Sequence, residues 1–322
     1  MARIELAKVK TYSVVKRKSK VKAQQFARPI SGRASFVEFW NSLPRLLASE
    51  DLRSLVRAIV RARRNSKPVI AMMGAHVVKC GLSPVLIDLI ERKVLTALAM
   101  NGAVAVHDCE MALFGATSED VARGLKDGSF GMAQEIGAFY NRAVGEAAKK
   151  KRGLGETLGK ALWEAKAKYL PLSLLAAARR LKLPATVHVA IGTDIVHQHP
   201  SANGAALGKA SFEDFLRFAG ELAELDRGGV VLNLGSAVIM PEVFLKALTV
   251  VRNLGHPARG FTTANFDMIQ HYRPRMNVVQ RPVEGGGKGY EITGHHEIMI
   301  PLLAAAVKAA LDKREFSLGE EP

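Results

Sequence analysis

Two patterns of apolar and polar positions alternate along the chain. Strand-like runs rich in Val, Ala, Leu and Ile occur at residues 68–75, 95–106, 184–194, 228–237 and 258–267. These runs lack the regular polar alternation of a half-exposed strand, and they are typical of parallel strands with both faces buried. Amphipathic segments separate them, as expected of helical crossovers. The sequence therefore predicts an α/β fold: a doubly wound, mostly parallel Rossmann-like sheet with helices on both faces.

Two of the amphipathic segments carry a capping box, which marks the start of a helix. Thr117 with Asp120 predicts one helix start, and Ser211 with Asp214 predicts another. No internal repeat or clear linker divides the chain. We therefore expect residues 36–322 to form a single α/β domain.

Positive charge is unevenly distributed, and residues 1–35 form a basic N-terminal arm ahead of the predicted domain. The chain has 46 Lys and Arg against 30 Asp and Glu, a formal net charge of +16. The basic residues cluster at 8–22, 57–67 and 148–153. Such clusters favour a nucleic acid, an anionic lipid surface or an acidic protein partner, and the alternative is a solvated basic surface.

The cysteine content and the longest apolar stretches exclude several classes of protein. Cys80 and Cys109 are too few for a disulfide framework or a four-cysteine zinc site, so a reducing cytoplasm is the expected location. The charged N-terminus does not resemble a signal peptide. The late apolar run that ends at Lys308 is too short to span a bilayer, so no membrane association is expected.

Small or polar residues follow the strand-like runs, and parallel strands would bring them to one edge of the sheet. Ligands of doubly wound folds bind in the crevice beyond this edge, and a set of such exits suits a dinucleotide. The exits are Gly74-Ala75-His76, Asn101-Gly102 with His107-Asp108, Gly192-Thr193-Asp194, Gly235-Ser236-Ala237 and Thr262–Asn265.

Short motifs add little to this interpretation. The chain has no GxGxxG sequence, and GLGETLGKA (153–161) departs from a phosphate loop in its glycine spacing and in Ala161, where Ser or Thr would bind magnesium. We predict a turn and the start of a surface helix there. The nine histidines leave a metal site open as an alternative, although no ligands are assigned. The candidate groups are His295-His296 with Glu297, His197 with His199, and His76 with His107.

Several segments resemble the deoxyhypusine synthase family. GAHVVKCGLSPVLIDLIERKVLTALAMNGAVAVHDCEMAL (74–113) is similar, without gaps, to the segment of that family with its first NAD contacts. GGVVLNLGSAVIMPEVFLKALTVVRNLG resembles its glycine turn and following helix, FTTANFD its Asn-Thr-Ala loop, and EIMIPLLAAAV its closing helix. The likeness covers residues 68–312. It implies a Rossmann-like NAD-binding fold, assembled as a tetramer of paired dimers.

The resemblance also implies which residues border the NAD cofactor. These are Ala75, His76, Asn101, Gly102, Asp194, Gly235, Ser236, Thr263, Ala264 and Asp267. Two departures argue against a true deoxyhypusine synthase. The Glu-Glu-Asp cluster of the family stands here as Val106-His107-Asp108, and its nucleophilic lysine falls near residues 278–283, which contain no lysine.

A second, shorter likeness concerns NGAVAVHDCEMALFGATSEDV (101–121). This segment resembles the C-terminal domain of lysine-ketoglutarate reductase/saccharopine dehydrogenase-like proteins that act as ornithine cyclodeaminases. The resemblance implies catalytic use of NAD, in which an amine is oxidised to an imine and later reduced again.

The leading hypothesis is an NAD-dependent enzyme of the transferase or cyclodeaminase type that acts on an amine or amino acid by transient hydride transfer. His107 would be the acid/base group, because imidazole titrates near neutral pH, and Asp108 would orient it or hold the ribose. The structural alternative for His107 is a helix cap. A second hypothesis is a non-catalytic NAD-binding protein whose basic arm contacts nucleic acid or an acidic partner. A third is a metal-assisted hydrolase.

Overall fold

The computed structural model describes residues 3–312, which contain a six-stranded, all-parallel sheet with the strand order β3–β2–β1–β4–β5–β6. The α/β class and the Rossmann-like sheet predicted from the sequence are confirmed. The first five strands fall within the five predicted runs. The strands are β1 (Val69–Met73), β2 (Ala97–Asn101), β3 (Ala185–His188), β4 (Val230–Leu234), β5 (Thr262–Asp267) and β6 (Lys288–Thr293).

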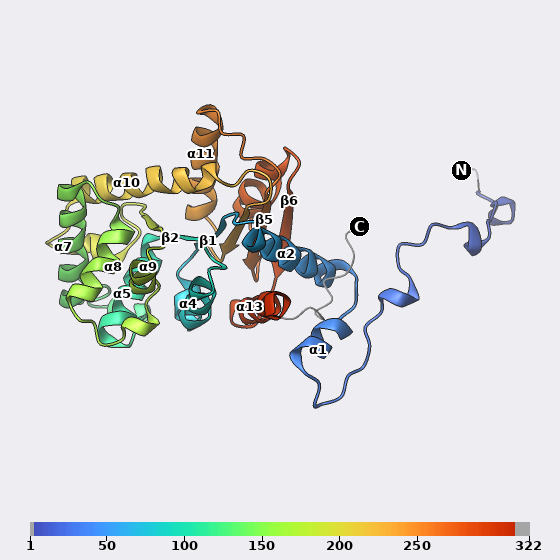
Figure 1. Cartoon of the computed structure of the whole chain (residues 1–322), viewed down its shortest axis with the longest axis horizontal. Helices are drawn as coiled ribbons and strands as arrows, with labels where there is room; N and C mark the ends of the chain where they lie inside the picture. The colour runs from blue at the N-terminus through green and yellow to red at the C-terminus, as the bar shows by residue number, and fades with distance from the viewer. Residues whose placement is uncertain (1–2, 313–322) are drawn as a thin grey trace.

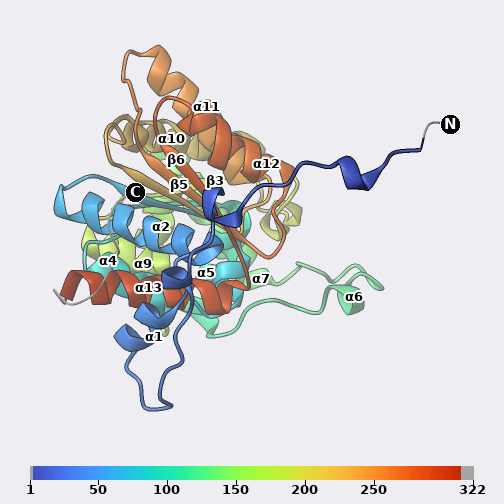
Figure 2. The same cartoon turned by 90° about the vertical axis from the view of Figure 1, so that its right-hand side faces the viewer.

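Helices cover both faces of the sheet (Figures 1 and 2). One face packs against α2 (Leu47–Arg64), α3 (His76–Lys79), α4 (Ser83–Glu91), α5 (Gly102–Phe114), α9 (Leu174–Leu181) and α13 (His296–Asp312). The other packs against α10 (Gly204–Ala223) and α11 (Ile239–Asn253). The remaining helices are α1 (Phe36–Ser42), α6 (Val121–Gly124), α7 (Gln134–Lys150), α8 (Leu154–Glu164) and α12 (Tyr272–Pro274). None of the helices in the described part of the chain is long and apolar enough to cross a bilayer.

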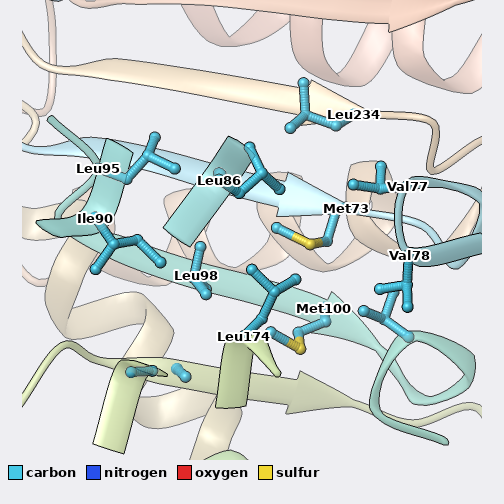
Figure 3. Packing of buried hydrophobic residues seen from close by; sticks show 14 of the residues in the cluster. Met73, Val77, Val78, Leu86, Ile90, Leu95, Leu98, Met100, Leu174 and Leu234 are labelled. Atoms are coloured by element: carbon cyan, nitrogen blue, oxygen red, sulfur yellow. The ribbon is translucent and has the colours of Figure 1, made fainter. Parts of the chain in front are cut away.

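The central strand β1 explains why its sequence is an unbroken apolar run. All of its residues are buried, and successive side chains point to opposite faces of the sheet. Ala71 and Met73 join the larger hydrophobic cluster, whereas Ile70 and Met72 join the smaller one. Figure 3 shows Met73 on the larger-cluster face, with side chains of α3, α4 and α9 around the neighbouring strands. Both faces of this strand are therefore core.

Side chains of α10 cover the outer edge of β3. Their position corrects the predicted capping box of Ser211 and Asp214. The helix begins at Gly204, so Ser211 and Asp214 lie inside it and do not form a capping box. The buried Asp214 carboxylate instead accepts hydrogen bonds from the backbone N–H of Val187 (2.8 Å) and of Gly155 (2.9 Å). These donors belong to an edge strand and to the start of α8, where they would otherwise be buried without partners.

Two further helix predictions need correction. Asp120 caps α6, and Thr117 is not part of that cap because its hydroxyl lies beside another helix, α5. The GLGETLGKA segment does begin a helix, α8, but it is not a surface helix. Leu154, Leu158 and Leu162 are fully buried between the neighbouring helices. Gly155 and Gly159 allow close packing, because a Cβ atom on either would lie within 2.5 Å of a neighbouring backbone carbonyl oxygen.

The segment formed by residues 3–35 extends away from the sheet and its helices (Figures 1 and 2). It contains three 3₁₀ turns, and nearly all of its described side chains are exposed. Backbone hydrogen bonds from Arg28 to Ser42 and from Arg45 to Gln25 join its last part to the region around α1.

Candidate functional site

The carboxyl ends of the parallel strands lie along one edge of the sheet, as the sequence predicted. The strand order reverses between β1 and β4, which is where ligands of doubly wound sheets bind. One predicted exit is wrong: Thr263 and Ala264 lie within β5, where they pair with Val231 and Leu232 and are fully buried. The strand continues to Asp267, which is half-buried at the edge.

At the point of reversal, two glycines bring the backbones after β1 and β4 into contact. A Cβ atom on Gly74 would lie 2.3 Å from the carbonyl oxygen of Gly235, and Gly235 adopts a left-handed φ of +69°. The ring of His296 covers Gly235 and lies within hydrogen-bond distance (3.0 Å) of the Phe266 carbonyl. Ser236, predicted to face the cofactor, is instead buried and accepts a hydrogen bond from the first turn of α11.

The second strand ends five residues earlier than predicted, and this changes the setting of His107 and Asp108. β2 stops at Asn101, whose side-chain oxygen accepts a hydrogen bond from the N–H of Val104 and caps α5. His107 and Asp108 therefore lie in the second turn of a helix and not at the end of a strand. Adjacent helical residues point about 100° apart. Of the two, only His107 lines a cavity that opens at the ends of β2 and β3.

Asp108 does not orient His107, so the predicted pairing is wrong. Its carboxylate is fully buried and accepts hydrogen bonds from the Ser173 hydroxyl (2.6 Å) and from the N–H groups of Leu174 (2.7 Å) and Leu175 (3.1 Å). Burial raises the pKa of Asp108 to about 6, although these hydrogen bonds oppose the rise. Asp108 caps the first turn of α9, and its role is structural.

His107 is oriented instead by Thr117 and Glu110. The Thr117 hydroxyl donates to the Glu110 carboxylate, and Nδ1 of His107 lies 2.6 Å from the Thr117 oxygen. Burial opposes ionisation of Glu110, but its hydrogen bonds to His107 and Thr117 hold its pKa below the ordinary value. Because the Thr117 hydroxyl donates its proton to the Glu110 carboxylate, the Thr117 oxygen accepts a hydrogen bond from the Nδ1–H group of His107. In the neutral ring, Nε2 is then free to accept a proton.

A cavity of about 240 Å³ opens beside His107 at the ends of β2 and β3. Its lining includes the carboxylates of Glu110, Glu119 and Asp194, the ammonium of Lys79, and the hydroxyl groups of Ser118 and Thr193. Val106, Val121, Phe130 and Ile195 provide its apolar lining. Three carboxylates against one ammonium make the cavity acidic within a strongly basic protein.

Asp194 supplies the least satisfied group of this cavity. The residue is 7% exposed, and its Oδ2 has no hydrogen-bond partner among the residues that the structure describes. Burial raises the pKa of Asp194 to about 6, while the nearby charge of His107 lowers it. Nε2 of His197 lies 3.9 Å away and is also without a partner in that part of the chain. A buried acceptor of this kind needs a donor.

The predicted cofactor residues occupy different settings along this edge. Asn101 and Gly102 adjoin Asp194, because Oδ2 of Asp194 lies against the Gly102 backbone. Ala75 is half-buried and His76 is exposed at the end of β1. Of the predicted metal-ligand groups, His197 and His199 do not converge. Two backbone N–H groups donate hydrogen bonds to Nδ1 of His197. Nε2 of His199 lies within hydrogen-bond distance of the Gly131 carbonyl oxygen.

Sequence reasoning missed Glu110 and Thr117, and it also missed a buried asparagine pair. Nδ2 of Asn233 donates to Oδ1 of Asn265 (2.7 Å) and to the carbonyl of Ser236 (2.9 Å). The signal was present, since each asparagine interrupts an otherwise apolar or small-residue strand. The pair holds the turn after β4.

No family model and no curated protein sequence matches the chain. Solved structures do resemble it. A conserved LOR/SDH protein from Methanococcus maripaludis S2 is 14% identical over 82% of this chain and 71% of that one, with a TM-score of 0.50. A deoxyhypusine synthase assigned in Entamoeba histolytica is 10% identical over 90% and 98%, with a TM-score of 0.54.

AgrE, solved as a ternary complex with ornithine and NAD+, is 13% identical with a TM-score of 0.54. The match covers 82% of this chain but only 33% of AgrE, so the chain spans about a third of that protein. At these identities the comparisons show the fold. The chain has the fold of deoxyhypusine synthase-like and LOR/SDH-like proteins.

Proposed function

We propose that the chain is an NAD-dependent enzyme that acts on an amine or an amino acid, with His107 as its acid/base group. One observation carries the proposal. At the carboxyl edge of a Rossmann-like sheet, an oriented imidazole and an unsatisfied buried carboxylate, Asp194, share one small acidic cavity. Such a convergence of titratable groups is what an active site requires.

The substrate class follows from the charge and size of the cavity. Its carboxylates attract a cationic amine, and Lys79 offers a partner for the carboxylate of an amino acid. About 240 Å³ suits a molecule of amino-acid size and not a whole dinucleotide.

One polar atom along this edge is suited to bind NAD. The unpartnered Oδ2 of Asp194 is suited to accept a hydrogen bond from a ribose hydroxyl. Ala75, His76, Asn101, Gly102 and Asp267 lie along the same edge and would border the rest of the molecule. NAD, when bound, supplies the hydride acceptor. The fold itself adds support, because the AgrE structure that shares it contains ornithine and NAD+.

The chain's own groups would handle the proton. Nε2 of neutral His107 takes a proton from the substrate amine, and the Thr117–Glu110 pair stabilises the imidazolium that forms. The acidic lining holds the amine, and the apolar side chains contact the rest of the substrate.

Turnover of a panel of amines and amino acids, followed by absorbance of reduced nicotinamide, tests this function. We expect His107→Ala to lower turnover by about 10²- to 10⁴-fold while NAD affinity is retained. His256→Ala is the control, because His256 is exposed near the opposite edge of the sheet. Wild-type turnover in His107→Ala would remove the assignment.

A second candidate activity concerns the basic arm, which carries seven Lys and Arg between residues 8 and 22, all exposed. We propose it as a contact for nucleic acid or an acidic protein. A gel shift that disappears with added salt and with removal of residues 1–35 supports nucleic-acid binding. Assembly as a tetramer of paired dimers also remains a proposal, and sedimentation tests it.

A further inference from the structure

We propose that His76, Cys80 and Glu297 bind a zinc-type divalent metal ion at the carboxyl edge of the sheet, beside the His107 cavity but with different ligands. Imidazole nitrogen, thiolate sulfur and carboxylate oxygen are all ligands of Zn²⁺ in proteins. Within residues 3–312, this is the one group of at least three potential ligands whose donor atoms all lie within 4.8 Å of one another.

The local structure explains how the sequence brings these ligands together. His76 begins α3 and Cys80 follows its last residue, so the two are four positions apart and share one side of the helical turn. Glu297 lies in the first turn of α13, 217 residues beyond Cys80, and its Oε2 is 3.7 Å from the Cys80 sulfur. The metal would therefore cross-link two distant segments of the chain.

The distances leave only a small adjustment for coordination. Ligand atoms around a tetrahedral zinc ion are about 3.3–3.8 Å apart, as metal–ligand lengths of about 2.0–2.3 Å require. The Cys80–Glu297 distance already falls in this range. The other donor atoms lie at most 4.8 Å apart. His76 and Glu297 are exposed, so their side chains can rotate to bring these atoms to the spacing that zinc requires.

Neighbouring histidines support the ligands. The ring of His296 packs edge-on against His76, with 5.6 Å between centroids, and His296 is itself within hydrogen-bond distance of the Phe266 carbonyl. Nδ1 of His295 lies 3.7 Å from the Glu297 carboxylate. Such outer contacts orient metal ligands. Three protein ligands leave a fourth position open to solvent, as in zinc sites that bind water or substrate.

Metal binding to the full chain, purified without a histidine tag and stripped with chelator, tests the site. Titration with Zn²⁺ should give one ion per chain. Co²⁺ should produce the near-ultraviolet thiolate-to-cobalt band. Cys80→Ser should abolish that band and weaken Zn²⁺ binding by more than about 100-fold, since even outer-shell changes cost 10- to 100-fold.

Two companion variants and one control make the test specific. His76→Ala and Glu297→Gln should also weaken Zn²⁺ binding, whereas His256→Ala should bind it as the wild type does. A Co²⁺ complex without the thiolate band, or wild-type Zn²⁺ affinity in Cys80→Ser, would overturn the proposal. An equal loss in the His256 control would also overturn it, because it would indicate scattered surface binding.

Discussion

The carboxylate of Asp194 rests on the backbone of Gly102, the first residue of α5: a Cβ atom there would lie only 1.9 Å from Oδ2. The contact exists because residue 102 has no side chain. It places an acidic group at the N-terminal end of a helix, where negative charge is stabilised. The same contact holds Asp194 in the cavity with His107.

Gly102→Ala should displace this carboxylate. We expect the free energy of unfolding to fall by about 1–3 kcal/mol, as for other overpacked buried sites, and NAD affinity to fall with it. Gly204→Ala is a matched control, because Gly204 also begins a helix after an asparagine cap and its Cβ would meet nothing within 4 Å. Chemical denaturation and calorimetry measure both. Equal stability in the two variants would contradict the close contact.

Thr117→Val should lower turnover without lowering NAD affinity. The change removes the acceptor for Nδ1 of His107 and the donor to Glu110, so the imidazole loses its fixed orientation. Misplacement of this kind can cost up to about 100-fold in rate. Thr117→Ser keeps the hydroxyl and should restore activity and the pH profile. Failure of serine to rescue would show that the methyl group, and not the network, matters.

Asp214 predicts an unusual dependence of stability on pH. Burial raises its pKa to about 7 in the folded protein, against 3.8 ordinarily, although the N–H groups of Gly155 and Val187 oppose the rise. The folded state therefore binds the proton more tightly, so this group's contribution to stability is lost as pH rises from about 4 to about 7.

Asp214→Asn mimics the protonated carboxyl and should lack this loss. Its stability relative to the wild type should improve by up to about 4 kcal/mol between pH 4 and pH 8. Glu213→Gln on the same helix, at a less buried position, is the control. Urea unfolding across the pH range is the measurement. Parallel curves for the wild type and Asp214→Asn would refute the prediction.

Two substitutions of buried polar residues in β5 should differ in their effect on the stability of the fold. Asn265→Leu removes a partner of the buried Asn233 side chain and should destabilise the fold by about 1–3 kcal/mol. Thr263→Val should be neutral or stabilising, because the Thr263 hydroxyl is buried with no hydrogen-bond partner in residues 3–312. Thermal unfolding compares them. A strong loss of NAD affinity in Thr263→Val would mean that β5 contacts the cofactor after all.

The sequence predicted β1 to β5 because strands buried on both faces have a composition that few other elements share. It did not predict β6, the edge strand, most of whose residues are half-buried or exposed. It could not predict where β2 ends. Residues 102–106 are small and apolar, and they are equally compatible with a buried strand and a buried helix. The Asn101 side chain caps this segment by accepting a hydrogen bond from the N–H of Val104, and this favours the helix. A strand ending later would have left His107 and Asp108 at the same edge.

The site was partly predictable for a related reason. His107, Gly102 and Asp194 were identified because they follow strands, and the structure brings them together. Asp108 was assigned to the site because it adjoins His107, but adjacent helical residues face different surroundings. Glu110 and Thr117 reach His107 through helical spacing and a loop. Glu110 shows no distinctive pattern in the sequence, and the pattern around Thr117 indicated a helix cap and not a contact with His107.

Calorimetric titration of the full chain with NAD, for the wild type and for Asp194→Asn, tests the central claim most directly. The amide substitution keeps the shape of the side chain but removes the charged acceptor beside Gly102. We expect one NAD per wild-type chain and affinity at least about 10-fold weaker in a folded Asp194→Asn variant. No heat of binding in the wild type, or equal affinity in both proteins, would contradict the assignment of this edge as a nicotinamide dinucleotide site.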